Sequence, residues 1–304
     1  MKFVLPAPHQ AFDLSMRDGA VIRVRQHGNP AGPRIALCHG NGLASDAYYP
    51  FWRLLEAQYE LILFDVRNHG RNPAHGADGH NWANFAGDQR EIHAGIASVL
   101  GAKPAVAAFH SLSAIAALSL AVDGEAPWSA LLLFDPPIPP PRDHRLYQAH
   151  LDDMTTMTGR SERRPERYRS TGMFEFQLRA GRGFQRWVEG AHRLVSETTL
   201  RYDEEAGDWA LACPRELEAK VFASNMDASI WPRIGDIEVP IKLVGADPGL
   251  EDATQPASSC RALAHEFAIP YECIPGTSHF LQIEQPERCA RIVEDFLARH
   301  VLAA

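Results

Sequence analysis

The sequence contains few cysteines: five in 304 residues, with no C-x-x-C pair among them. So few scattered thiols exclude a disulfide-stapled scaffold. An odd number of isolated cysteines is typical of a reduced protein, and we therefore expect a cytoplasmic location. The 22 glycines show no three-residue period, which excludes a collagen-like chain.

Long apolar runs are also missing. The longest, residues 112–122, is interrupted by serines, and it is far shorter than the roughly 20 apolar residues that a membrane-spanning helix needs. Near the N-terminus, Pro6 stands before any apolar run develops, so we expect no export signal. The sequence therefore predicts no association with a membrane.

Basic charge is not in excess, since 30 Lys and Arg residues face 38 Asp and Glu residues for a net charge of −8. A nucleic-acid binder needs the opposite balance to neutralise phosphates. No phosphate-binding or dinucleotide-binding glycine motif is present, and His, Cys and acidic residues do not show zinc spacing. We expect no cofactor, no metal and a small-molecule partner, in a monomer or a homodimer.

What the sequence does contain is a rhythm of short apolar runs alternating with helical patterns. Most of the runs are continuous, which is typical of central strands covered on both faces. This alternation predicts an α/β fold with a mostly parallel sheet flanked by helices. The predicted strands are residues 21–24, 35–38, 61–64, 105–109, 130–134, 241–244 and 271–274.

One segment departs from this rhythm. Between residues 142 and 220, 28 of 79 residues are charged, against 22% in the whole chain, and the segment has no convincing strand. We predict a helical insertion at residues 139–225, called the inserted segment below, with an amphipathic underside. The remaining residues, 1–138 and 226–304, are predicted to form the core domain.

Ser111 stands where a predicted strand runs into a helical pattern. A serine at such a sharp turn is typical of a nucleophile elbow, which has the pattern Gly-x-Ser-x-Gly. Here Ser113 fits the second small position, but Phe109 does not fit the first. An ordinary strand–helix junction, with both serines as helix-start residues, is the alternative interpretation.

Two further polar residues follow predicted strands. Asp247 comes shortly after residues 241–244, and His279 lies on a glycine-containing loop after residues 271–274. Taken alone, each has a simpler explanation, since a lone histidine is usually structural and a lone aspartate usually forms a turn. Together with Ser111 they give the order Ser, Asp, His at the ends of strands, where open α/β sheets place their sites.

The sequence resembles the α/β-hydrolase superfamily, in particular serine-nucleophile members with a helical cap that are similar to esterases and lipases. The resemblance covers about residues 20–135 and 235–300. It is carried by His-Gly-Asn-Gly at 39–42, Asp-Val-Arg-Asn-His-Gly at 65–70, His-Ser-Leu-Ser at 110–113, Gly-Ala-Asp at 245–247 and Gly-Thr-Ser-His-Phe at 276–280.

This resemblance implies a catalytic triad in which Ser111 is the nucleophile, His279 the general base and Asp247 the acid that orients the histidine. Asp135 and Asp252 are rival acids. Asp135 follows a strand too, but the two prolines after it make it look like a loop starter, so we prefer Asp247.

The resemblance also implies an oxyanion hole and a substrate pocket. The backbone N–H groups of Asn41 and Leu112 are the candidates for the oxyanion hole. The side chains that we expect to contact substrate are those of His39, His110, Met173, Phe174, Phe176 and Trp187, the last four as an apolar wall.

The predicted function is hydrolysis of a carboxylic ester with a small or medium acyl group, through an acyl-enzyme intermediate. A serine-dependent carbon–carbon bond hydrolase and a cofactor-free haloperoxidase or perhydrolase use the same framework and stay open. A non-catalytic small-molecule receptor on the same fold is the alternative from another class.

Overall fold

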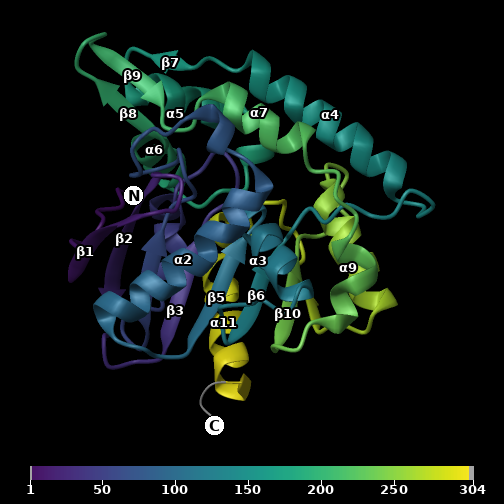
Figure 1. Cartoon of the computed structure of the whole chain (residues 1–304). Helices are drawn as coiled ribbons and strands as arrows, with labels where there is room; N and C mark the ends of the chain where they lie inside the picture. The colour runs from purple at the N-terminus through teal and green to yellow at the C-terminus, as the bar shows by residue number, and fades with distance from the viewer. Residues whose placement is uncertain (1, 301–304) are drawn as a thin grey trace.

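An open, mostly parallel sheet forms the centre of the computed structural model, which describes residues 2–300 (Figure 1). The strand order is β1-β2-β4-β3-β5-β6-β10-β11, with β1 and β2 antiparallel to their neighbours and the other pairs parallel. The strands are β1 (Gln10–Ser15), β2 (Val21–Gly28), β3 (Arg34–Cys38), β4 (Glu60–Phe64), β5 (Ala105–His110), β6 (Ala130–Phe134), β10 (Ile241–Gly245) and β11 (Tyr271–Cys273). The predicted fold class is confirmed.

Helices cover both faces of this sheet, because strands β3 to β6 are mostly apolar and are buried along their whole length. In Figure 1, α2, α3 and α9 lie in front of the sheet and α11 lies behind it, and one apolar cluster fills the space on each side. The core helices are α1 (Tyr49–Trp52), α2 (Trp82–Leu100), α3 (Leu112–Val122), α8 (Ile230–Arg233), α9 (Gln255–Glu266), α10 (Leu281–Glu284) and α11 (Pro286–His300), with 3₁₀ turns η1 (Ser45–Tyr48), η2 (Ala77–Gly79) and η4 (Ile234–Asp236).

The register of the parallel strands brings their carboxyl ends to one edge of the sheet. Cys38 of β3 pairs with Phe109 of β5, and Phe134 of β6 pairs with both His110 and Val244. The loops that follow these strands therefore begin at the same level. The five stretches that carry the family resemblance lie at or after the carboxyl ends of β3, β4, β5, β10 and β11.

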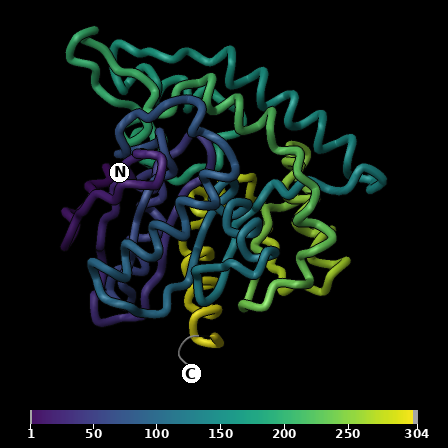
Figure 2. The backbone as a smooth tube through the Cα atoms, viewed as in Figure 1, coloured from purple at the N-terminus to yellow at the C-terminus, as the bar shows by residue number. Residues whose placement is uncertain are grey.

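The inserted segment leaves the core after β6, returns before β10 and lies above this edge of the sheet (Figures 1 and 2). It contains α4 (Tyr147–Arg163), β7 (Arg167–Tyr168), α5 (Thr171–Ala180), η3 (Arg182–Phe184), α6 (Ala191–Thr199), β8 (Leu200–Asp203), β9 (Asp208–Leu211) and α7 (Arg215–Ala223). The expectation that it has no strand is wrong, because β7, β9 and β8 form a small antiparallel sheet. These strands have two to four residues each, too few to show a period of two.

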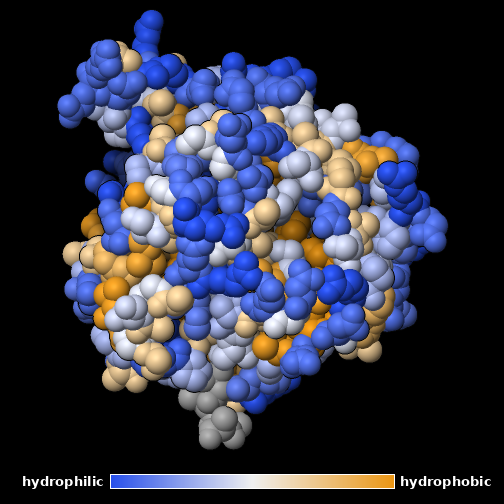
Figure 3. Space-filling model, viewed as in Figure 1, coloured by the Kyte–Doolittle hydropathy of each residue, from blue (hydrophilic) through white to orange (hydrophobic). Residues whose placement is uncertain are grey.

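Polar contacts attach the inserted segment to the core. The Arg201 guanidinium donates to the backbone oxygens of His69 and Gly70, with its Nη2 at 2.9 Å from the Gly70 oxygen. Arg186 forms a bidentate ion pair with Asp252, in which Nη1 and Nη2 each lie 2.8 Å from one carboxylate oxygen. The outer surface of the segment is largely hydrophilic in Figure 3, in keeping with its charge. Within residues 2–300, no helix combines the length and apolarity that crossing a bilayer requires.

Candidate active site

Ser111 lies on the tight turn between β5 and α3. Its backbone has φ 54° and ψ −112°, a conformation that costs a non-glycine residue about 1–3 kcal/mol and persists only where the surroundings enforce it. The surroundings do so here: the Ser111 N–H donates to the Phe134 oxygen at 3.0 Å, and its carbonyl accepts the Ile115 N–H at 3.1 Å. The Ser111 hydroxyl does not cap the helix, so it stays available to other partners.

The imidazole of His279 lies against this hydroxyl. His279 Nε2 is 3.0 Å from Ser111 Oγ, and His279 Nδ1 is 2.7 Å from Asp135 Oδ2. A carboxylate can only accept, so Nδ1 carries the proton and Nε2 accepts the hydrogen bond from the serine. The three side chains form a continuous chain of hydrogen bonds, Ser111 to His279 to Asp135, in which the carboxylate is fully buried.

The expectation that Asp247 lies beside His279 is wrong. Its two carboxylate oxygens accept the backbone N–H groups of Gly249 at 2.8 Å and Gly276 at 2.9 Å, and these bonds lower the pKa of the Asp247 carboxyl. The Asp247 N–H donates to the Thr277 oxygen at 3.0 Å. Asp247 therefore attaches the loop that carries His279 to the end of β10, through both its carboxylate and its backbone N–H.

Asp135 occupies the place expected for Asp247 because β6 and β10 are neighbours in the sheet. Asp135 directly follows β6, and Asp247 comes one residue further from the end of β10. The sequence does not show which of the two side chains points toward His279. Asp135 has φ 43°, and its second oxygen accepts the Ala246 N–H at 3.1 Å. The other rival, Asp252, is paired with Arg186 at an exposed position.

The loop after β3 passes close to the turn at Ser111. A side chain at Gly40 would place its Cβ 2.9 Å from Ser111 Cβ, so only glycine permits this approach. The expected oxyanion donors, the N–H groups of Asn41 and Leu112, have no hydrogen-bond partner within residues 2–300. Leu112 is also the first residue of α3, where the helix dipole favours negative charge.

The ring nitrogens of His39 and His110, which we expected to contact substrate, are bonded within the protein. His39 is fully buried, with Nδ1 at 2.7 Å from the Gly40 oxygen and Nε2 accepting the Val66 N–H at 3.0 Å. Both ring nitrogens of His110 are also bonded within the protein, to Tyr48 and to the His279 backbone. Burial lowers the pKa of both histidines, which favours the neutral form of each ring.

The four side chains of the inserted segment that we expected to form an apolar wall do not lie together in the structure. Met173 and Phe176 are 52% and 75% exposed on α5, which does not fit a pocket wall. Phe174 is buried against Tyr168, within the inserted segment itself. Trp187 alone among the four lies near His279, because the centroid of its ring is 5.2 Å from that of Phe280, the residue after His279.

A cleft of about 470 Å³ opens between α4 and the start of α9. Most of its lining residues are polar, and they include Asp152, Asp153, Thr254 and Gln255. Burial raises the pKa of the Asp153 carboxyl, and the charge of His279 partly offsets this effect. These polar residues differ from the apolar pocket that the sequence suggested.

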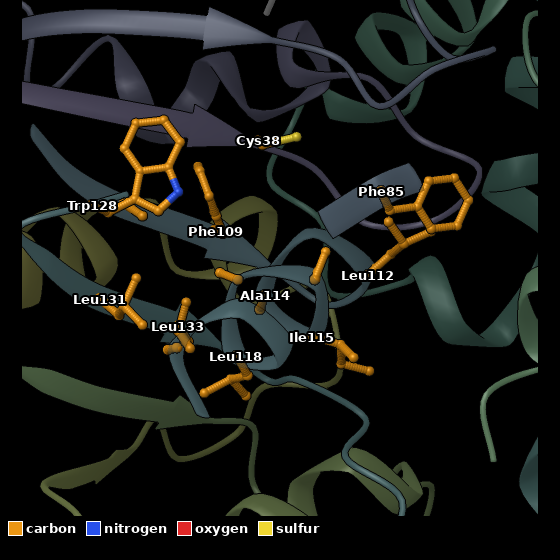
Figure 4. Packing of buried hydrophobic residues seen from close by; sticks show 14 of the residues in the cluster. Cys38, Phe85, Phe109, Leu112, Ala114, Ile115, Leu118, Trp128, Leu131 and Leu133 are labelled. Carbon is orange, nitrogen blue, oxygen red and sulfur yellow. The ribbon is translucent and has the colours of Figure 1, made fainter. Parts of the chain in front are cut away.

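Phe109, the bulky residue at the first small position of the elbow, fits because its side chain turns into the core. Its ring lies edge-on to those of Phe64 and Trp128, with centroids 5.7 and 5.3 Å away, and it is fully buried (Figure 4). Ser113 fills the second position as predicted, and its hydroxyl bonds to the backbone oxygens of Cys38 and His110. The turn at Ser111 thus forms without the usual glycines.

One buried side chain near the site, that of Glu284, was not predicted from the sequence. Glu284 accepts hydrogen bonds from the Ser278 N–H, at 2.7 Å, and from the Ser278 hydroxyl, which steadies the residue next to His279. Burial raises the pKa of the Glu284 carboxyl. The spacing of six residues between these partners carries no sequence signal. Within residues 2–300, no group of three or more His, Cys, Asp or Glu side chains could hold a metal ion.

Comparisons with known proteins agree with this architecture. A family model described as the alpha/beta hydrolase family matches residues 35–292. No curated protein matches significantly. Among solved structures, the chain is similar to E-2-(acetamidomethylene)succinate hydrolase, with 17% identity and a TM-score of 0.75 over 95% of this chain and 99% of that chain.

Two further solved structures have a similar fold. One is the thioesterase domain from the curacin biosynthetic pathway, with 16% identity and a TM-score of 0.69 over 94% of this chain and 98% of that chain. The other is a thermophilic esterase from Thermogutta terrifontis, with 17% identity and a TM-score of 0.68 over 96% of this chain and 100% of that chain. At these identities the likeness concerns the fold alone.

Proposed function

Because the chain belongs to the alpha/beta hydrolase family, we propose that it is a serine hydrolase that cleaves a carboxylic ester through an acyl-enzyme intermediate. The observation that carries this proposal is the chain of hydrogen bonds from Ser111 through His279 to Asp135. A free serine hydroxyl is a weak nucleophile at neutral pH, and an adjacent base oriented by a third group is the arrangement that activates it.

In the first half of the reaction, Ser111 Oγ attacks the ester carbonyl carbon while its proton passes to His279 Nε2. The imidazolium that forms is stabilised by the Asp135 carboxylate. The negative carbonyl oxygen of the tetrahedral intermediate accepts hydrogen bonds from the Asn41 and Leu112 N–H groups, each worth roughly 10²–10³ in rate. The imidazolium then protonates the departing alcohol, and the acyl group stays on Ser111.

In the second half, a water molecule takes the place of the alcohol. His279 removes a proton from the water as it attacks the acyl-enzyme carbonyl. The second tetrahedral intermediate collapses, the carboxylic acid leaves, and the proton returns from His279 to Ser111 Oγ. The same two N–H groups serve both intermediates, so one oxyanion site is sufficient for the full cycle.

We propose that the inserted segment acts as a cap that limits the substrate to a small or medium acyl group. Its position above the carboxyl edge of the sheet (Figure 1) and the low exposure of Ser111, at 6%, support a restricted entrance. Trp187 supplies an apolar surface near His279 through Phe280.

The test is an ester panel of graded acyl length, assayed with the native protein and with Ser111→Ala. We expect turnover of short and medium esters by the native protein and a loss of at least about 10³-fold in Ser111→Ala, since the nucleophile is removed. Equal rates in the two proteins would overturn the proposal. Turnover of a dienoate diketone with feeble ester activity would instead indicate carbon–carbon bond hydrolysis, and binding without turnover a receptor.

A further inference from the structure

Two buried side chains beside the triad have no part in the mechanism described above. Tyr48 ends the η1 turn, and His110 is the last residue of β5, directly before Ser111. The Tyr48 hydroxyl lies 2.7 Å from His110 Nδ1 and 3.3 Å from the Gly40 nitrogen. On its other side, the His110 ring places Nε2 2.8 Å from the backbone oxygen of His279. Both side chains are at most 5% exposed.

The direction of each hydrogen bond in this chain follows from its ends. The His279 carbonyl can only accept, so His110 Nε2 carries a proton and donates it. His110 Nδ1 is then an acceptor for the Tyr48 O–H, and the Tyr48 oxygen accepts the Gly40 N–H. This assignment requires a neutral His110, and burial together with the nearby His279 lowers the pKa of His110 well below its usual range.

This chain connects three loops that meet at the reacting atoms. Gly40 precedes Asn41, which carries one of the two oxyanion donors. His110 is the residue directly before Ser111. The backbone oxygen of His279 belongs to the same residue as the imidazole that acts as the general base. The loops come from β3, β5 and the segment after β11, which are far apart in sequence. The close approach of Gly40 to Ser111 means that a small shift of one loop changes the relation of donor to nucleophile.

We propose that Tyr48 and His110 are positioning residues that hold the oxyanion loop, the nucleophile turn and the general-base loop in one reactive arrangement. This inference rests on the proposed serine-hydrolase function. A misplacement of about 1 Å among reacting groups can cost on the order of 10²-fold in rate. Since the three loops meet where charge develops, their displacement affects the transition state more than substrate binding.

The first test is Tyr48→Phe, which removes the hydroxyl and keeps the ring that lies against His110. We expect kcat to fall by about ten- to a hundredfold while KM changes by less than about twofold. The matched control is Tyr168→Phe, which removes another buried hydroxyl, one bonded to Pro165 and Gln177 within the inserted segment. An equal kcat loss in the two variants, or a loss that only follows thermal stability, would overturn the inference.

A second pair of variants replaces His110 itself. His110→Gln keeps an N–H donor that can reach the His279 carbonyl, whereas His110→Ala has none. We expect kcat to decrease in the order native, His110→Gln, His110→Ala, with both variants soluble and folded. Equal kcat values for His110→Gln and His110→Ala would show that this bond does not position the base and would contradict the inference.

A measurement without substrate separates this inference from the proposed function. Proton–nitrogen NMR of the imidazole groups is expected to show His110 protonated at Nε2 in the native protein, with a changed shift in Tyr48→Phe and an unchanged one in Tyr168→Phe. Protonation at Nδ1 would contradict the inference whatever the enzyme's activity. A protein with the expected tautomer that hydrolyses no ester would overturn the proposed function, and with it the positioning role.

Discussion

At the scale of single residues, two aspartates that follow neighbouring strands have different hydrogen-bond partners in the structure. Asp135 and Asp247 both follow strands that end at the same edge of the sheet. The Asp135 side chain is fully buried and reaches His279 Nδ1, while Asp247 is occupied by the backbone N–H groups of its own and a neighbouring loop. These two amide bonds hold the Asp247 carboxylate to the loops, and the imidazole of His279 is bonded to Asp135 instead.

This difference predicts opposite outcomes for two conservative variants. Asp135→Asn replaces the acceptor at His279 Nδ1 with an amide, which favours the wrong tautomer and is expected to lower kcat by roughly 10³- to 10⁴-fold at unchanged fold. Asp247→Asn is expected to lower the melting temperature because the His279 loop is less firmly attached, with kcat reduced by less than about tenfold. Steady-state kinetics and thermal unfolding measure both. The opposite ranking of the two kcat values would contradict our assignment of the acid.

At the scale of elements, the features that were predictable have strong local signals. The central strands are continuous apolar runs between turn residues, and all seven that were predicted are present. Ser111 was predicted because it stands directly after such a strand, and His279 because it lies on the loop after the last one. The edge strand β1 was missed because only Phe12 and Leu14 among its large side chains face the core.

What the sequence could not predict depends on contacts between distant elements. The small sheet of β7, β8 and β9 forms from polar stretches that have no period of their own. The exposure of Met173 and Phe176 depends on how α5 packs against α6, which no single helix pattern determines. His39 and His110 were expected to contact substrate because they stand beside the motifs, yet their ring nitrogens are used inside the fold.

At the scale of the whole molecule, buried neutral histidines make the fold sensitive to acid. Burial lowers the pKa of His27 and of His80 to about 4, and also lowers the pKa of His39, His69 and His110. In the unfolded chain these groups titrate near 6.5. Between about pH 6.5 and 4 the unfolded state therefore binds more protons, and the stability falls as the pH is lowered.

We therefore expect the free energy of unfolding, measured by urea titration, to be nearly constant above pH 7 and to fall steeply below about pH 6. Each such histidine contributes a slope of about 1.4 kcal/mol per pH unit. His80→Gln should reduce the slope, and His265→Gln, at an exposed position, should leave it unchanged. A stability that does not vary between pH 7 and 5 would contradict the neutral, buried state of these rings.

The central claim of this account is that Ser111 is a nucleophile activated by His279 and Asp135. The most direct test is covalent labelling of the native protein with a fluorophosphonate, followed by intact-mass and peptide mass spectrometry. The account predicts a single adduct on the Ser111 peptide, formed at least about 10³-fold more slowly in Asp135→Asn and absent in Ser111→Ala. No adduct in the native protein, or one that persists in Ser111→Ala, would contradict it.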